Sequence, residues 1–215
     1  EYLIYSGDGN IPIALEVIFP PKATPVYRLK ADISNLSLKI PSLGFSKNRF
    51  DSGELGVGWT QNTPLNVQFS SNGYQVSALT YLKDNKITRV DFKNIKLGQY
   101  FIGQGSYQVR DSEDILTLQD SVFHYFNTPK YKTSKFKKPL KIIVGFKKLH
   151  ISPEVSLDNF EGSFLFDRTF NGSGVGDLNS GPLLNLNLKI TPNTTYIKGY
   201  SDNAGSVLLK SKMYS

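Results

Sequence analysis

When the chain is aligned with itself at a shift of 118 residues, the two copies match best at glycines, prolines and other residues that form turns and strand ends in β-proteins. Identity falls at 13 of the 65 positions from 21 to 85, against about four expected for unrelated chains of ordinary composition. The matches include Gly56-Val57-Gly58 with Gly174-Val175-Gly176, Pro64-Leu65 with Pro182-Leu183, and Asp84-Asn85 with Asp202-Asn203. Self-similarity at a fixed period predicts a duplicated structural unit.

The composition predicts that both units are built from strands. Alanine is scarce, whereas the chain holds 12 tyrosines and 14 phenylalanines among its 215 residues, which is typical of sheets rather than helices. This length allows two cores of about a hundred residues each. We therefore expect an all-β protein with two antiparallel β-sandwich lobes, residues 1–97 and 98–215, related as a degenerate tandem repeat.

The clearest strand pattern is the alternation in Leu184–Ile190, which places four aliphatic side chains on one face and polar side chains on the other. The segment Leu65–Phe69 shows the same alternation and also follows a proline, so we expect the same inside-outside orientation in both lobes. The glycine-rich stretch Asn171–Gly176 lacks the lysine and the following helix of a phosphate-binding loop. We expect a loop or a bulge there.

The reactive residues indicate a protein that is not an enzyme and needs no cofactor. Cysteine is absent, which excludes disulfides, thiolate nucleophiles and cysteine metal sites. The two histidines, His124 and His150, stand in strand-like segments without a further ligand at metal-binding spacing. Carboxylates cluster at Asp51 with Glu54 and at 111–114, where turn capping is the simpler role. No apolar run is long enough to cross a bilayer, so we expect no membrane span.

The net charge of +7 is concentrated in one segment, from Pro129 to Lys148, which holds eight lysines and no acidic residue. This run could contact a polyanion through Lys130, Lys132, Lys135, Lys137 and Lys138. Alternatively, it is a solvated edge whose lysines discourage sheet aggregation. We do not expect nucleic-acid binding, because the run has no arginine and few aromatic residues.

The second half resembles the H-type lectin domain, the family of snail agglutinins and discoidin C-terminal domains. The resemblance rests on Gly103–Asp111, on Phe136–Ser152, and on a closing order of strands over Leu186–Ile190, Tyr196–Asn203 and Ser206–Tyr214. The chain departs from the family pattern in having Tyr200 where tryptophan is common, and in an insertion of about twenty residues within Pro153 to Gly181.

This resemblance implies a six-stranded sandwich that binds a sugar between subunits of an oligomer. The implied ligand-binding residues are Asp111, Lys189, Tyr200, Asp202 and Asn203. Each also has a structural role open to it, such as capping a turn or packing. Aspartate and asparagine form hydrogen bonds with sugar hydroxyls, and an aromatic ring covers the apolar face of a sugar.

Our leading hypothesis is therefore a multivalent, extracellular or surface-exposed lectin that binds glycans or glycoconjugates as a homo-oligomer. The alternative is a structural subunit of a surface fibre, phage tail or virion, in which the sheets serve assembly. A further alternative is polyanion binding through the lysine run, which would depend steeply on salt.

Overall fold

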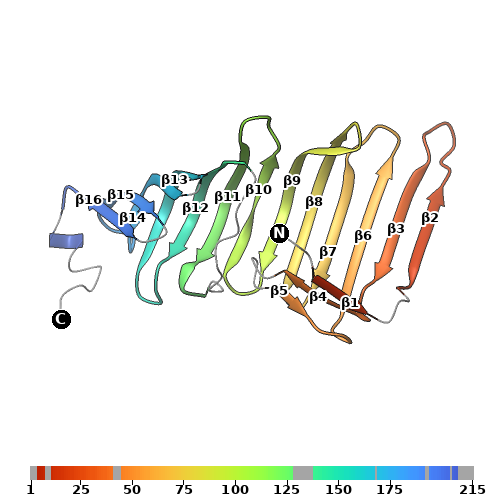
Figure 1. Ribbon diagram of the computed structural model, residues 1–215, viewed down its shortest axis with the longest axis horizontal. Helices are drawn as coiled ribbons and strands as arrows, with labels where there is room; N and C mark the ends of the chain where they lie inside the picture. Colours follow the sequence, from red (N-terminus) through yellow and green to blue (C-terminus); the bar gives the residue numbers. More distant parts are fainter. Residues whose placement is uncertain are drawn as a thin grey trace. The chain divides into compact units, whose positions relative to one another are not determined.

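The computed structural model describes residues 4–7, 11–40, 45–127, 138–167, 169–191, 194–203 and 205–207. The chain divides into two compact units, one comprising the described residues up to Gln99 and the other those from Tyr100 onward. Strands make up most of both units (Figure 1). The prediction of an all-β protein is confirmed.

Unit 1 contains a six-stranded sheet in which every neighbouring pair is antiparallel, in the order β9-β8-β7-β6-β3-β2. Its strands are β2 (Ile13–Ile18), β3 (Val26–Asp32), β6 (Gly53–Thr60), β7 (Leu65–Ser71), β8 (Tyr74–Lys83) and β9 (Lys86–Leu97). Two-residue turns at Asn72-Gly73 and Asp84-Asn85 take positive φ at both positions, as tight β-hairpins require. The sequence signals for these hairpins were therefore sound.

A small sheet of β1 (Ile4–Gly7), β4 (Leu36–Ile40) and β5 (Phe45–Lys47) belongs to the same unit. Phe45 is buried, and its ring meets those of Phe69 and Tyr74 edge to face at 5.6 and 4.9 Å. The small sheet thus covers part of the apolar face of the large one. This layering over part of unit 1 is the sandwich-like feature that the described residues show.

The charged end of Lys47 fixes that small sheet in place. Lys47 is only 1 % exposed, and its ammonium donates hydrogen bonds to the carbonyl oxygens of Ser34, Leu36 and Asn48 at 2.8–3.1 Å. A buried ammonium is tolerated only when its donors are satisfied in this way.

Unit 2 contains a seven-stranded sheet in the order β10 to β16. Its strands are β10 (Phe101–Gln108), β11 (Asp114–His124), β12 (Leu140–His150), β13 (Ser156–Asp167), β14 (Thr169–Leu178), β15 (Leu183–Ile190) and β16 (Thr195–Tyr200), with the 3-10 turn η2 (Tyr125–Asn127) after β11. The pair β11 and β12 is parallel, while the other neighbouring pairs in this sheet are antiparallel. The expected all-antiparallel sandwich is therefore wrong at this pair.

Each large sheet is apolar on one face and polar on the other. In unit 1 a row of directly paired residues crosses all six strands: Leu15, Leu29, Val57, Val67, Ala78 and Phe92. In unit 2 the corresponding row is Tyr107, Leu116, Ile142, Phe164, Gly172, Leu188 and Ile197. The alternation seen in the sequence at Leu184–Ile190 is confirmed as strand β15 of such a sheet.

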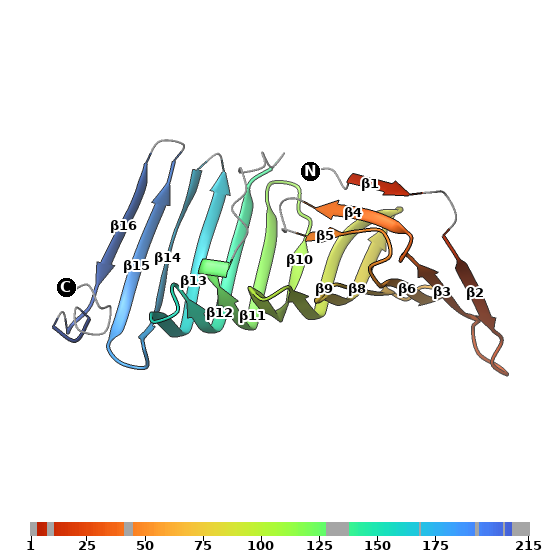
Figure 2. The ribbon, with the colours of Figure 1, turned by 90° about the horizontal axis from the view of Figure 1, so that it is seen from below.

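The sheet of unit 2 is bent across its strands. Register shifts occur in β10 near Gly103, in β11 between Leu118 and Val122, and in β13 between Asp158 and Glu161. Asp120 and Asn159 take positive φ at two of these places, as bulges do when they increase the local twist. Figure 2 shows β10 to β13 turning near one end.

The apolar side lies on the inside of this bend, because the side chains there are buried and those on the other side are exposed. Phe101, Phe146, Phe160, Leu157 and Leu178 are all buried. We call the apolar side of this sheet the inner face of unit 2 and the polar side its outer face. The described residues of unit 2 form no second sheet.

The glycine-rich stretch is the central part of β14, so the expectation of a loop or bulge at Asn171–Gly176 is wrong. Its alternate glycines face inward, and added Cβ atoms would collide with the aromatic rings and backbone of β13. At Gly172 the collision involves Phe164 and Ser163, and at Gly174 it involves Phe160 and Glu161. The glycines are needed because phenylalanine rings lie flat on this strand.

The 118-residue shift matches strand positions but reverses the faces. β7 begins at Leu65 and β15 at Leu183, a separation of 118 residues. Leu65 shares the apolar face with Val67 and Phe69, whereas Leu183 points away from the inner face that carries Leu184 and Leu186. A one-residue slip exchanges the two faces of a strand. The equal orientation that we expected at this shift is therefore wrong.

Candidate binding surfaces

Two of the residues implied by the lectin resemblance, Lys189 and Tyr200, share the outer face of the sheet edge. Lys189 pairs with Tyr196 across β15 and β16, and Tyr200 pairs with Asn185. Asp202 and Asn203 follow directly after β16 and are exposed. The Asn203 side-chain oxygen accepts a hydrogen bond from the Ser206 backbone at 3.0 Å, so it caps the helical turn at 205–207. The H-type lectin resemblance predicted a closing strand over Ser206–Tyr214, and the helical turn lies where that strand was expected to begin. Residues 208–215 lie outside the described residues.

Asp111 lies at the opposite end of the same sheet. It precedes Asp114, the first residue of β11. The residues paired in turn across the sheet from Asp114 are Leu140, Phe166, Phe170, Ile190 and Thr195, and Thr195 begins β16. Tyr200 is the last residue of β16, and five strand spacings separate β11 from β16. A single chain therefore does not bring Asp111 together with Asp202 and Asn203.

The outer face of β16 also holds two residues that the sequence reasoning missed. Tyr196 and Lys198 alternate with Tyr200 along the strand, and both tyrosines are exposed. The Lys198 ammonium lies 4.7 Å from the centre of the Tyr200 ring, and a hydrogen bond to Tyr200 raises the pKa of Lys198. The signal available in the sequence was the spacing of every second residue in Tyr196, Lys198 and Tyr200.

Most of the lysines named for polyanion contact, Lys130, Lys132, Lys135 and Lys137, lie outside the described residues. Lys138 is described, and its ammonium donates to the Arg110 carbonyl oxygen at 2.9 Å and lies 3.7 Å from Asp114. Lys147 and Lys148 lie 3.3 and 3.5 Å from Asp120 and Asp158. These three lysines of the run each have a carboxylate partner, which weakens their attraction for a polyanion.

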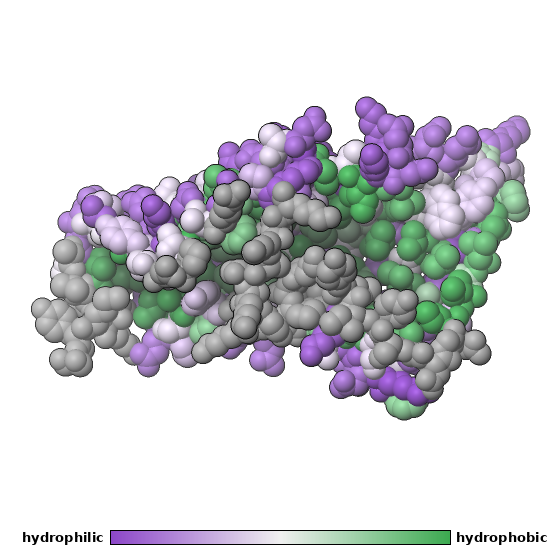
Figure 3. Space-filling view, in the orientation of Figure 1, coloured by the Kyte–Doolittle hydropathy of each residue, from purple (hydrophilic) through white to green (hydrophobic). Residues whose placement is uncertain are grey.

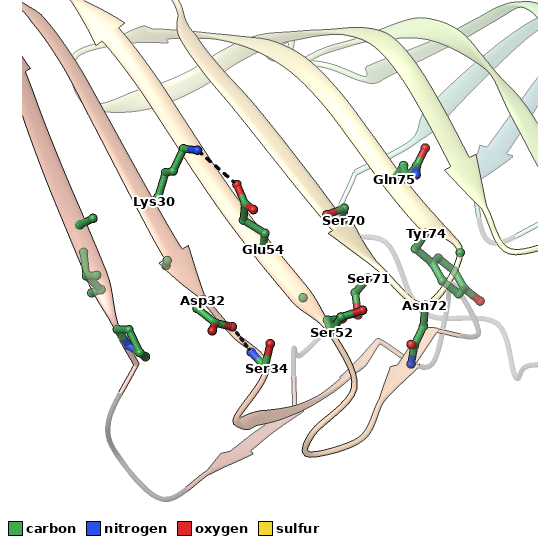
Figure 4. Close-up of a pocket in the computed structure, with 16 residues that line it drawn as sticks. Lys30, Asp32, Ser34, Ser52, Glu54, Ser70, Ser71, Asn72, Tyr74 and Gln75 are labelled. Atoms are coloured by element: carbon green, nitrogen blue, oxygen red, sulfur yellow. Dashed lines mark hydrogen bonds and ion pairs between the residues drawn. The ribbon is translucent and has the colours of Figure 1, made fainter.

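Each unit has an open hollow on its polar face. In unit 1 it measures about 860 Å³ and is lined by polar residues of β3, β6, β7 and β8, with Lys30 and Glu54 3.9 Å apart (Figure 4). Hydrogen bonds from the side chain and from the backbone N–H of Ser34 lower the pKa of Asp32. In unit 2 a hollow of about 660 Å³ lies over Gly145, between Glu161, Asn185 and Asn187. Both hollows are shallow and bring no catalytic set of residues together.

The two histidines meet at the parallel pair of strands. His124 and His150 pair directly, and their rings stack at 4.3 Å with planes 2° apart. Burial lowers the pKa of His150, and the nearby His124 and Lys148 add to the effect. Among the described residues, no group of three or more His, Cys, Asp or Glu side chains is placed to hold a metal ion.

The inner face of unit 2 is a continuous apolar surface. Near-parallel phenylalanine rings follow one another from Phe146 to Phe160, Phe164 and Phe170, with ring centres 5.2–6.4 Å apart. Exposure increases from the buried bend toward the sheet edge, where Ile190 is 38 % and Ile197 is 65 % exposed. Where described residues of unit 2 are visible in Figure 3, hydrophobic residues lie between hydrophilic residues above and below them.

Comparisons with protein-family models, with curated proteins and with solved structures give no match for this chain. Its function is therefore argued from these surfaces. Within the described ranges, none of the helical segments has the length and apolar character that a membrane span requires.

Proposed function

We propose that this chain is a non-enzymatic binding protein that holds a lipid-like ligand, with a long hydrocarbon chain, against the inner face of unit 2. The observation that supports this proposal most directly is the apolar row from Leu116 through Ile142, Phe164 and Leu188 to Ile197 in a unit whose described residues form no second sheet. Monomeric proteins rarely leave a large contiguous apolar surface without a function.

The size of the inner face suits a hydrocarbon chain. Seven strands at about 4.8 Å spacing span about 29 Å across the sheet. The hydrocarbon core of a bilayer, which is two acyl chains thick, measures about 30 Å. A ligand lying across the strands therefore has room for one or two acyl chains along the apolar row.

The local shape favours a slender ligand over a second sheet. Sandwich packing places two sheets about 10 Å apart and interdigitates the side chains of both inner faces. Here Gly172 and Gly174 of β14 project no side chain from the inner face, and atoms of Phe164 and Phe160 occupy the space that a Cβ would take. This strand therefore offers few side chains to interdigitate with a second sheet.

Charged pairs lie on either side of the apolar row, near the two ends of the strands that it crosses. Asp114 and Lys138 stand 3.7 Å apart at one end, and Lys148 and Asp158 stand 3.5 Å apart at the other. Tyr107 donates a hydrogen bond to Asp114 at 2.6 Å, and burial raises the pKa of Tyr107 to about 12. A ligand with a polar head group would place that group at one of these ends, because the head group needs polar partners or water.

Cysteine protection tests the proposal, because the chain has no cysteine of its own. Leu188→Cys places a single thiol on the inner face of β15, and Asn187→Cys places one on the outer face next to it. The rate of alkylation by a water-soluble maleimide is measured with and without palmitoyl lysophosphatidylcholine, below its micellar concentration. We expect the lipid to slow alkylation at position 188 at least fivefold and to leave position 187 unchanged.

Glycerophosphocholine, which is the same head group without the acyl chain, is the matched control and should protect neither thiol. Equal alkylation rates with and without the lipid at position 188, in a variant with wild-type circular dichroism, would contradict the proposal. Equal protection at both positions would indicate adsorption of the lipid without use of the inner face.

A second candidate function is glycan binding, which the outer face of β15 and β16 favours. Exposed Tyr196 and Tyr200 flank Lys198, and Asn185, Asn187 and Lys189 stand opposite them on β15. Exposed aromatic rings beside amide and ammonium donors suit the mixed surface of a sugar. We propose this surface, with Asp202 and Asn203 beside it, in place of a single cluster that includes Asp111.

A glycan array read at two salt concentrations tests this second candidate. Tyr200→Ala and Lys189→Ala should abolish salt-resistant binding, whereas Asp111→Ala, at the far end of the sheet, should preserve it. Loss of binding in Asp111→Ala alone would instead favour the family-like site between subunits. Absence of binding by the unaltered chain would remove the candidate.

A further inference from the structure

Highly exposed apolar side chains lie on the two outermost strands, β2 and β16. On β2, Ile13 and Leu15 are 62 % and 61 % exposed, and on β16 all six residues are exposed. Within the described part of the chain, each of these strands pairs along one side only, β2 with β3 and β16 with β15. Each therefore presents a row of unpaired backbone groups.

Neither edge carries the usual protection against further pairing. The register of β2 with β3 runs without a bulge from Ile13 to Ile18, and that of β16 with β15 from Thr195 to Tyr200. Neither strand contains proline, and each contains a single charged residue, Glu16 or Lys198. Natural edge strands are usually short, bulged or more heavily charged.

The backbone groups that point outward belong to the apolar residues of both strands. The Asp32 N–H donates to the Pro12 carbonyl oxygen, so the even-numbered residues of β2 bond to β3 and Ile13, Leu15 and Val17 point outward. Likewise, the Thr191 N–H donates to Thr194, so the even-numbered residues of β16 bond to β15 and Ile197 and Gly199 point outward. The two edges therefore match in hydrogen-bonding phase and in face.

We propose that β2 of one molecule pairs antiparallel with β16 of a second copy of this chain. One register matches five residues on each strand, 14–18 of β2 with 196–200 of β16, and places Leu15 opposite Gly199 and Val17 opposite Ile197 on the apolar side. In that register Glu16 stands opposite Lys198 on the polar side, so the single charges of the two edges attract. Pairing β2 with β2, or β16 with β16, would bring like charges onto the same interface.

This contact is head to tail, because it joins two different edges. After two copies have joined, one β2 and one β16 remain open, and further copies can add in the same way. The apolar faces of the joined sheets then adjoin across the new strand pair. The inference does not depend on lipid binding, and it gives the structural-assembly hypothesis a defined contact.

Proline substitutions at outward-pointing positions can test the contact without breaking either sheet. Leu15→Pro and Ile197→Pro each remove a backbone N–H that faces away from the neighbouring strand, a position where proline is tolerated. Circular dichroism and the melting temperature confirm that each variant is folded. Sedimentation velocity then measures the size of the wild type, of each variant and of an equimolar mixture of the two.

The head-to-tail contact predicts that the wild type forms oligomers that grow with concentration, and that each variant alone is a monomer. The mixture should give one-to-one dimers and nothing larger, because it retains one intact β2 and one intact β16. Dimers formed by Leu15→Pro alone or by Ile197→Pro alone would overturn the proposal in favour of symmetric pairing. A monomeric wild type, or a mixture that stays monomeric, would overturn it outright.

A charge exchange sharpens the assignment of the register. Glu16→Lys and Lys198→Glu should each weaken wild-type oligomers at least fivefold in dissociation constant, and Glu16→Lys and Lys198→Glu combined in one chain should restore them. Glu54→Lys, in the interior of the unit 1 sheet, is the control and should leave association unchanged. Failure of the combined variant to recover would contradict the pairing of Glu16 with Lys198.

Discussion

Strands β6 and β14 both contain the sequence Gly-Val-Gly, yet they use it in opposite ways. In β6, Val57 lies on the apolar face between Leu29 and Val67, while Gly56 and Gly58 lie on the polar face. In β14, Gly174 and Gly176 lie on the inner face under Phe160, while Val175 points outward. The same three residues thus contribute an apolar side chain in one unit and space for aromatic rings in the other.

The difference shows that identity at a fixed spacing does not establish structural equivalence in a β-protein. Strands β7 and β15 begin 118 residues apart, each directly after a proline, because prolines and turn residues set where strands begin. The face of each side chain depends instead on a period of two residues, so an odd shift in pairing reverses every role. The comparison leads to four predictions.

The largest effect is expected at Gly174. In Gly174→Ala, the added Cβ would collide with the Phe160 ring and the Glu161 carbonyl oxygen, and relieving the collision should cost about 3 kcal/mol. In Gly56→Ala, the nearest atom to the added Cβ is Gln68 Cβ at 3.8 Å, so we expect a change within about 0.5 kcal/mol. Urea unfolding of both variants measures the two free energies. Equal losses of unfolding free energy in the two variants would contradict the different use of glycine in β14 and β6.

The second prediction concerns how each unit covers its apolar face. In unit 1 the small sheet that Lys47 fixes covers part of this face, whereas the described residues of unit 2 form no second sheet. Lys47→Met keeps the length of the side chain but leaves the carbonyl oxygens of Ser34, Leu36 and Asn48 without their donor. We expect a loss of about 2 kcal/mol, with faster hydrogen exchange in β4 to β6 and unchanged exchange in unit 2.

Lys83→Met, at an exposed position near the end of β8, is the matched control and should change neither quantity. If Lys47→Met accelerated exchange equally in both units, the role of Lys47 would not be confined to the small sheet.

The sequence predicted the kind of fold better than its arrangement. Alternation at Leu184–Ile190 and turn residues such as Asp84-Asn85 act locally, so the strands and hairpins that they indicate could be found from the sequence. The parallel pairing of β11 with β12 depends on contacts between segments that are separated along the chain. The strand at Asn171–Gly176 was missed because its glycines make sense only beside Phe160 and Phe164 of the neighbouring strand.

For the candidate binding surfaces, too, the sequence predicted local features but not how distant segments are arranged. Lys189 and Tyr200 were named from the resemblance and do share the outer face of β15 and β16, where Tyr196 and Lys198 join them. Asp111 could not be placed from the sequence, because its distance from Asp202 depends on the order of the four strands between β11 and β16. The inner face of unit 2 needs both the strand order and the bend, and neither has a local signal.

The third prediction tests whether Val57 and Val175 lie on opposite faces of their sheets, one apolar and one polar. Val57→Asn places an amide on the apolar face between Leu29 and Val67, where no partner is available in either side chain, so we expect a loss of about 1.5 kcal/mol. Val175→Asn places the amide on the outer face between Glu161 and Asn185, and we expect a change within about 0.5 kcal/mol. Thermal unfolding of both variants measures the difference. A larger loss in Val175→Asn would reverse our assignment of the faces.

The smallest effect is a dependence on pH that belongs to unit 2. His150 stacks on His124 and has Lys148 and Asp158 nearby, and burial is the main cause that lowers its pKa below the ordinary value of 6.5. The unfolded chain therefore takes up a proton at a higher pH than the folded chain, so acidification favours unfolding. The stability that the neutral histidine provides should be complete above about pH 6.5 and lost as the pH falls through the folded value. Asp158, whose pKa is lowered mainly by a hydrogen bond from Ser180, loses its contribution only below about pH 4.

The urea midpoint, measured at pH 7.5 and 5.5, should therefore fall more in the wild type than in His150→Gln, which keeps a neutral polar side chain at both pH values. A fall of the same size in both proteins would place the acid sensitivity elsewhere in the molecule. Because unit 1 has no histidine, local hydrogen exchange at pH 5.5 should increase in β11 and β12 before it increases in β6 to β8. If hydrogen exchange increased simultaneously in both units, the units would unfold together. The difference between β6 and β14 would then affect the stability of the whole chain.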